Sequence, residues 1–120
     1  MLSTKKLLYK LISAYGANVT YVTPSNGIDG GLRLWRDRAS GTVRCYGYFL
    51  KATDIAQATT IFQIPSGYRP NESYAVPMFL TTTSGSTAYY GVVTTAGTMT
   101  QSLGNTIRAG MVCGEWPYVE

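Results

Sequence analysis

Short β-prone segments separated by turn residues constrain the fold of this chain more than any other feature of its sequence. Val, Thr, Ile and aromatic residues gather in short stretches, and Gly, Pro, Asn or Ser residues stand between them. Turn signals about 8–12 residues apart are typical of an all-β sandwich or barrel. The pattern leaves both open, and of the two we choose an antiparallel, jelly-roll-like β-sandwich. Its predicted strands cover residues 18–23, 32–36, 42–52, 59–64, 74–83, 89–95, 98–102 and 106–113.

Alternation within the strands predicts which side chains face the core, because successive side chains point to opposite faces. Leu32 and Leu34 are expected to point inward, with Arg33 and Trp35 on the opposite face. In the next strand one face carries Val43, Cys45, Gly47 and Phe49.

Glycine and proline place the turns. Residues 24–27, 29–31 and 40–41 are predicted turns, since Gly, Asn and Pro suit the backbone angles that turns need. Pro77 interrupts the strand over 74–83, and because proline cannot donate a ladder hydrogen bond, we expect an edge strand or a bulge there.

The first residues carry a different pattern. Residues 4–15 are predicted to form a short amphipathic helix, with leucines at helical spacing and lysines toward the other side. The apolar side of this helix either forms a short seam with other copies, packs on the chain's own sheet or lies on a membrane surface. We expect residues 1–16 to be a helical anchor and residues 17–120 to be the β domain. The proposed seam consists of Leu8, Leu11, Ile12 and Tyr15.

Charged residues make up only 13% of the chain, against about 25% in an average soluble domain. Either oligomer contacts hide much of the surface, or Thr, Ser, Gly and Tyr cover it in place of charge. Arg33, Arg36, Arg38 and Arg44 are the one basic cluster of the β region, with Asp37 among them, so we expect no nucleic-acid partner. The sequence also predicts no membrane span and no secretion signal.

The sequence offers little for catalysis. It contains no histidine, which removes Ser-His-Asp and Cys-His nucleophile systems and histidine-bound zinc. Cys45 and Cys113 are too few for a four-cysteine metal site, and we expect small buried thiols, although neighbouring strands could bring them together. Asp29, Asp37, Asp54, Glu72 and Glu115 are interpreted as exposed turn carboxylates rather than a hydrolytic pair. We therefore expect no enzyme, metal or cofactor.

An ordered series of motifs occupies the middle of the chain. Residues 64–70 read Ile-Pro-Ser-Gly-Tyr-Arg-Pro and lead into the strand over 74–83. Tyr-Gly-Val-Val at 90–93, a turn at 96–97 and residues 99–102 then follow as a hairpin. This series resembles the C-terminal head domains of tail fibres and receptor-binding proteins of tailed bacteriophages and prophages.

The resemblance covers roughly residues 33–113, and the first eleven residues look like the start of small phage structural proteins. Met99 and Thr100 stand where an aliphatic residue is usual, and the chain is shorter than a typical fibre. The resemblance implies a homotrimer around an axis, carried on a virion that is assembled in the bacterial cytoplasm. It further implies contacts with other virion proteins through the N-terminal helix, and host attachment by binding a surface saccharide.

A saccharide site needs aromatic faces together with polar groups that fix the orientation of the sugar. Loops carry function more often than strands do, so residues 84–90 and 68–73 are the first candidates for the saccharide site. We expect one of Tyr89 and Tyr90 to be the main saccharide contact. For Trp35 we prefer a structural role over a ligand contact. The candidates are Trp35, Tyr46, Tyr48, Tyr89, Tyr90, Trp116, Asp37, Asn71, Glu72 and Asn105.

Three other functions stay open at this point. The first is a purely structural virion protein, such as a head fibre, collar or tail decoration. The second is a secreted trimeric jelly-roll ligand of the complement or tumour-necrosis-factor type. The third is a hydrolase that uses two carboxylates.

Overall fold

The structure is a computed structural model, and it describes residue 4, residues 19–104 and residues 106–118. The predicted helix over residues 4–15 falls almost entirely on residues that the structure does not describe. The seam residues Leu8, Leu11, Ile12 and Tyr15 all lie outside the described part, as does Asn105.

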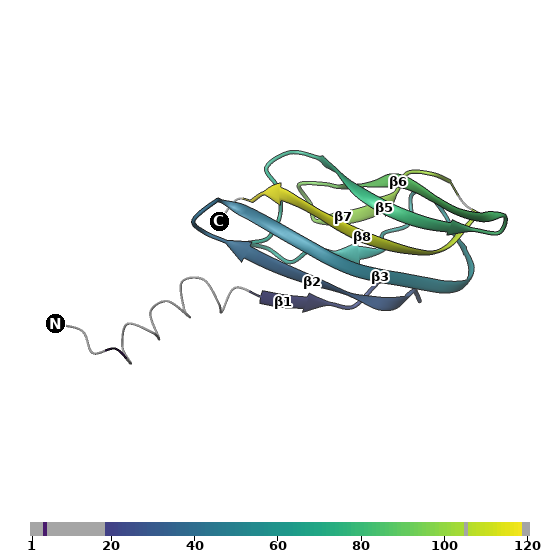
Figure 1. Cartoon of the computed structure of the whole chain (residues 1–120), viewed down its shortest axis with the longest axis horizontal. Coiled ribbons are helices and arrows are strands. Elements are labelled where there is room, and N and C mark those ends of the chain that lie inside the picture. The colour runs from purple at the N-terminus through teal and green to yellow at the C-terminus, as the bar shows by residue number, and fades with distance from the viewer. Residues whose placement is uncertain (1–3, 5–18, 105, 119–120) are drawn as a thin grey trace.

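The described part is an antiparallel all-β domain, which confirms the all-β, antiparallel part of the predicted fold class. Eight strands form one sheet in the order β1-β2-β3-β8-β5-β6-β7-β4 (Figure 1). Their bounds are β1 Val19–Val22, β2 Asp29–Asp37, β3 Thr42–Ile55, β4 Phe62–Gln63, β5 Tyr74–Thr82, β6 Gly85–Val93, β7 Thr98–Gln101 and β8 Ile107–Pro117.

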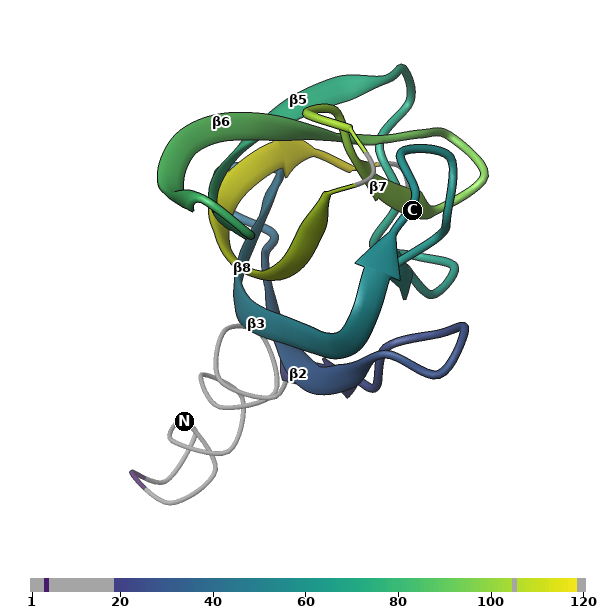
Figure 2. The same cartoon turned by 90° about the vertical axis from the view of Figure 1, so that its right-hand side faces the viewer.

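The sheet rolls up until it nearly closes into a barrel, as the end-on view shows (Figure 2). The segment after β1 reaches the segment before β4, where the Ser25 N–H donates to the Ile61 carbonyl oxygen at 2.8 Å. The Asn26 side-chain amide donates to the Thr60 carbonyl oxygen at 2.9 Å. The jelly-roll connectivity is not confirmed, because all eight strands belong to one continuous sheet.

The core lies inside the rolled sheet, and the alternation predicted from the sequence is correct. Leu32 and Leu34 are buried, and so are Val43, Cys45 and Phe49 of β3. Glycines make room for these side chains: a Cβ atom on Gly110 would collide with the buried ring of Phe49. The inner face has no room for a methyl group at Gly110, and one added there must displace the ring of Phe49.

Of the turns predicted over residues 24–27, 29–31 and 40–41, the second is wrong. Residues 25–27 form a turn, with Asn26 and Gly27 at φ 58° and 73°. Residues 29–31, by contrast, belong to β2, where Gly30 pairs with Phe49. Gly30 has φ 132°, and a side chain there would collide with the Tyr48 carbonyl oxygen. The glycine therefore serves a close approach of two strands rather than a turn.

The second half of the domain brings three further corrections. β5 lies between β8 and β6, so Pro77 is not on an edge strand; its ladder with β8 starts one residue later, at Met78. Residues 84–90 are not a flexible loop, because β6 starts at Gly85. There it pairs with Thr82, the last residue of β5, and the pairing continues back along β5 to Tyr74. β8 also continues to Pro117, past the predicted end, because its last residues pair with the start of β3.

Residues 64–70 form a loop that is held at one end of the barrel. The Arg69 Nε–H donates to the Ile64 carbonyl oxygen at 2.8 Å, which closes the turn. The guanidinium of Arg36 lies 4.8 Å from the centre of the Tyr68 ring and donates to the Gly67 carbonyl oxygen at 3.2 Å. The indole N–H of Trp116 donates to the Tyr68 carbonyl oxygen at 2.7 Å. These contacts fix the loop beside the ends of β2 and β8.

One polar side chain, Gln101, is fully buried in the described core. Its amide nitrogen donates to the carbonyl oxygens of Ile55 and Gly104. Its amide oxygen accepts from the backbone N–H groups of Leu103 at 2.7 Å and Gly104 at 3.0 Å. Gln101 thereby ties the turn after β7 to the far end of β3. Among the described residues, no helix has the length and apolar character needed to cross a membrane.

Candidate ligand-binding site

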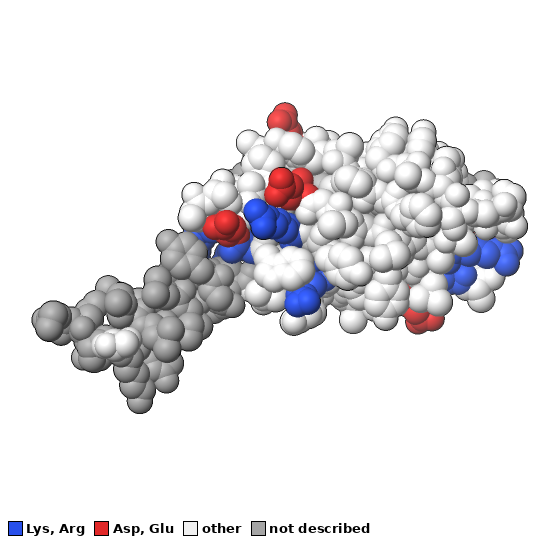
Figure 3. Space-filling model, viewed as in Figure 1, with Lys and Arg blue, Asp and Glu red and all other residues white. Residues whose placement is uncertain are grey.

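On the face shown in Figure 3, charged side chains of the described domain gather toward the two ends of the barrel and leave a wide uncharged area between them. At one end Arg44 and Glu115 form an ion pair with a Nε–Oε2 distance of 3.4 Å. Toward the other end Arg108 and Asp54 form a pair with a Nε–Oδ1 distance of 2.9 Å. Both pairs are exposed, so each contributes little to stability.

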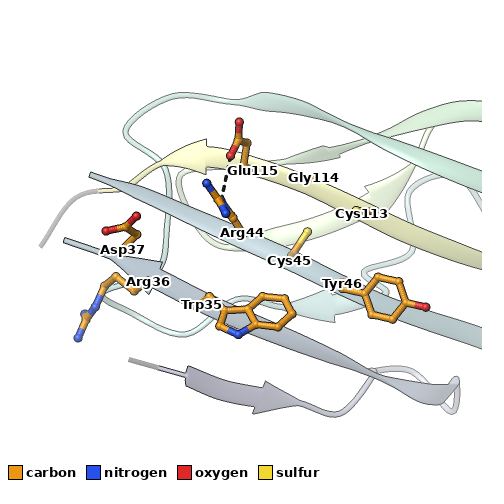
Figure 4. A pocket seen from close by; sticks show the side chains of 9 residues that line it. All are labelled: Trp35, Arg36, Asp37, Arg44, Cys45, Tyr46, Cys113, Gly114 and Glu115. Carbon is orange, nitrogen blue, oxygen red and sulfur yellow. Dashed lines mark ion pairs between the residues drawn. The ribbon is translucent and has the colours of Figure 1, made fainter. Parts of the chain in front are cut away.

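A hollow of about 800 Å³ lies on the outer face of the sheet at the Arg44–Glu115 end (Figure 4). The last part of β2, the first part of β3 and the last part of β8 form its floor. Its volume falls within the range of about 300–1,000 Å³ that small-molecule sites occupy. The residues that line it are Trp35, Arg36, Asp37, Arg44, Cys45, Tyr46, Cys113, Gly114 and Glu115.

Two aromatic rings provide the apolar surface of the hollow. Trp35 is half-buried and Tyr46 is exposed, because both occupy outward positions on adjacent strands. The Arg33 guanidinium lies 4.5 Å from the centre of the Trp35 ring and 6.0 Å from that of Tyr21. This cation–π contact orients the indole and covers part of it.

Charged groups stand beside these rings. The sheet register places Trp35 opposite Arg44, and Arg44 opposite Glu115. The carboxylate of Asp37 closes the turn between β2 and β3 and accepts from the Ala39 N–H at 2.9 Å. A hydrogen bond from the Ser40 side chain, together with backbone N–H groups, holds the pKa of Asp37 below its ordinary value. Asp37 is therefore an ionised turn residue at the margin of the hollow.

The two cysteines take opposite faces of the sheet. Cys45 is buried in the core, and burial raises the pKa of its thiol to about 12. Cys113, on the neighbouring strand, is exposed and lies opposite Tyr46. Both thiols are free. Because Cys45 is buried and Cys113 is exposed, the expectation of two buried thiols is correct for Cys45 and wrong for Cys113.

Tyr89 and Tyr90, the leading candidates from the sequence, lie in β6 and are equally exposed. Their rings stack on each other with centroids 4.7 Å apart and an interplanar angle of 30°. Each ring therefore covers part of its partner's face. Neither tyrosine lines the hollow.

The other predicted contacts lie apart from Trp35. Trp116 is 1% exposed and belongs to the core, so the prediction that it contacts a ligand is corrected. Asn71 and Glu72 are exposed in the loop before β5, and neither lines the hollow. The Glu72 carboxylate accepts from the Tyr74 hydroxyl at 3.3 Å. The pKa of Tyr74 is raised, first by partial burial and then by the charge of Glu72.

Sequence reasoning missed Arg44, Glu115 and Cys113 as residues of the hollow. Arg44 was noted only as part of a basic cluster, and Glu115 only as one of several carboxylates. Strand alternation placed Arg44 outward, but the neighbours across the sheet follow from the β3–β8 register, which no local pattern indicates.

The hollow thus combines aromatic surface with groups that donate and accept charge-assisted hydrogen bonds. Within the described part of the chain, no group of three His, Cys, Asp or Glu side chains is placed to hold a metal ion. Comparison with protein-family models and with curated protein sequences finds no match for this chain.

Proposed function

We propose that this chain is a non-catalytic saccharide-binding head domain on a bacteriophage or prophage virion. It acts in host attachment, three copies assemble around an axis, and the hollow receives the saccharide. The same proposal includes two further features. The domain is related to the jelly-roll-like heads of fibres, and residues 1–16 form a helical anchor that contacts other virion proteins.

The hollow carries the binding part of this proposal. A pyranose ring has an apolar face, which stacks on aromatic side chains such as Trp35 and Tyr46, and hydroxyl groups around its edge. Arg44 can donate to those hydroxyls, and Glu115 can accept from them. The exposed ion pair between the two residues costs little to rearrange around a ligand.

The virion part rests on the resemblance of the motif series that starts at residues 64–70. That loop is fixed to the barrel end that carries the hollow, through the contacts of Arg36 and Trp116. The residues that carry the resemblance therefore also support the ligand end of the domain.

A hydrolase is the second candidate, because Asp37 and Glu115 line the same hollow. The lowered pKa of Asp37 suits an ionised base or nucleophile but not the acid that protonates a glycosidic oxygen. That acid would have to be Glu115, whose exposed carboxylate is already paired with the Arg44 guanidinium at 3.4 Å. We therefore favour binding over hydrolysis. A structural virion protein and a secreted trimer are the remaining alternatives, and neither needs a saccharide.

A glycan array of bacterial surface polysaccharides, probed with the labelled full chain, tests the binding proposal. We expect selective binding that Trp35→Ala weakens by about tenfold or more. Leu103→Ala is the control, because Leu103 is an exposed apolar residue that does not line the hollow. Tyr90→Ala tests the alternative site on β6.

Two results would contradict the proposal. The first is an array without any glycan bound above background. The second is binding that Trp35→Ala leaves intact. If Tyr90→Ala alone abolishes binding, the saccharide site lies on β6 and the hollow is not the receptor site.

A further inference from the structure

The outer faces of three adjacent strands, β3, β8 and β5, carry large apolar side chains that point away from the core. They alternate along each strand with the buried residues that fill the barrel. We name this surface the outer apolar face. It consists of Tyr46, Tyr48, Leu50, Phe79, Met111 and Cys113.

The sheet register shows that the outer apolar face is continuous. Met111 pairs with Tyr48 on one side and with Phe79 on the other, which forms a row across three strands. Tyr46 and Cys113 pair in the adjacent row toward the hollow. Leu50 lies two residues beyond Tyr48 on the same face of β3. Residues two apart on one strand and opposite on the next are in contact range.

The size of this surface is that of a functional contact patch. Tyr48 is 54% exposed, Phe79 52% and Met111 47%. With aromatic side chains covering about 150–250 Å² each, the outer apolar face exposes on the order of 500 Å². The largest apolar patch on a typical monomer covers about 300–600 Å² and is often functional, so a face of this area marks a candidate contact surface. A standard interface covers about 800 Å² on each partner, so this face has the size of an interface centre.

The charges around the outer apolar face suit a second copy of the same chain. All six of its residues are uncharged, so a partner must present an uncharged surface in return, as this face itself does. Along β3 and β8 the face is bounded by the Arg44–Glu115 pair at one end and the Asp54–Arg108 pair at the other. Each end carries one positive and one negative group, and on the β2 side Arg33 lies opposite Tyr46 and Asp29 opposite Leu50. Two copies can therefore meet in either direction without an excess of like charge.

We infer that the outer apolar face is the surface through which copies of this chain pack together. The inference names the contact surface for the assembly in the proposed function and rests on that part alone, not on saccharide binding. Its centre, Met111, lies outside the hollow, whereas Tyr46 and Cys113 belong to both surfaces. The hollow therefore lies at the margin of the contact.

Light scattering of the full chain, combined with one matched pair of substitutions, tests the inference. We expect a wild-type mass that is a whole multiple of 13.0 kDa greater than one. Met111→Glu places an unpaired charge at the centre of the contact and should weaken association by about a hundredfold or more. Leu103→Glu is the control, because Leu103 is an exposed aliphatic residue outside the outer apolar face, and its mass should equal that of the wild type. Far-ultraviolet circular dichroism verifies that both variants are folded.

Cys113 provides a second readout that needs no substitution. Its thiol lies within the outer apolar face, whereas the thiol of Cys45 is buried in the core. In the assembled protein a maleimide should label Cys113 slowly, and dilution into the dissociated range should accelerate labelling several-fold. Peptide mass spectrometry identifies which thiol has reacted.

A wild-type chain that remains monomeric at millimolar concentration overturns the inference. So does an assembly in which folded Met111→Glu keeps its mass and Cys113 labels at the same rate at every concentration. If Met111→Glu does not fold, the labelling of wild-type Cys113 decides alone. A negative glycan array leaves these results unchanged, so the saccharide proposal and the interface can fail separately.

Discussion

Gln101 allows the fold to be tested with a single side chain. Its buried amide makes four hydrogen bonds, all to backbone groups, which join the turn after β7 to Ile55 at the end of β3. Gln101→Met keeps the length of the side chain but leaves two N–H groups and two carbonyl groups without this partner. At about 0.5–1.5 kcal/mol for each of the four net hydrogen bonds, we expect a loss of about 4 kcal/mol in the free energy of unfolding. For a domain of this size that loss lowers Tm by about 16 °C.

Urea denaturation followed by circular dichroism measures this loss, with all variants at one protein concentration because assembly shifts apparent stability. Gln57→Met is the matched control: Gln57 is exposed and donates one hydrogen bond, to the Ser102 carbonyl oxygen in the same turn. It should cost less than about 1 kcal/mol. If Gln101→Met costs no more than Gln57→Met, the buried amide does not hold the turn and the reasoning is refuted.

Two further stability predictions follow from the core. Gly110→Ala should destabilise the fold by about 1–3 kcal/mol, because the added methyl group meets the ring of Phe49. Gly31→Ala is the control: it has open space around it and should change the stability by less than about 1 kcal/mol. Thermal denaturation compares the two variants. Burial raises the pKa of the Cys45 thiol from 9.0 to about 12 in the folded protein. Between these two pH values the thiol stays protonated in the folded protein but ionises in the unfolded chain. The free energy of unfolding must therefore fall as the pH rises from 9 toward 12. Between pH 8 and 10 the fall due to Cys45 should be about 1.4 kcal/mol, and Cys45→Ala should lack it; equal pH dependence in both proteins would contradict the buried, protonated thiol.

The sequence predicts most strands because their signal is local. Alternation over residues 42–52 is visible within one strand, and the structure buries Val43, Cys45 and Phe49 as expected. The errors occur where a distant partner decides the conformation. Gly30 looked like a turn residue, yet the close approach of Tyr48 on the next strand requires it.

The candidate site was predicted only in part for the same reason. Alternation placed Trp35 outward, and the structure brings it to the hollow. The pairing of Arg44 with Glu115 depends on the β3–β8 register, which joins residues far apart in the chain. Trp116 was expected at a ligand, but its pairing opposite Val43 buries it in the core. Aromatic composition alone cannot distinguish such positions.

Tryptophan emission offers the most direct test of binding at the hollow without catalysis. The chain has two tryptophans, Trp35 at the hollow and Trp116 in the core. A saccharide selected on the array is titrated into the full chain, and the recovered saccharide is analysed by mass spectrometry. The account predicts a saturable change in emission that Trp35→Phe abolishes, with the saccharide recovered intact. An unchanged emission at saturating saccharide would contradict binding at the hollow, and a cleaved saccharide would show that the protein is a hydrolase.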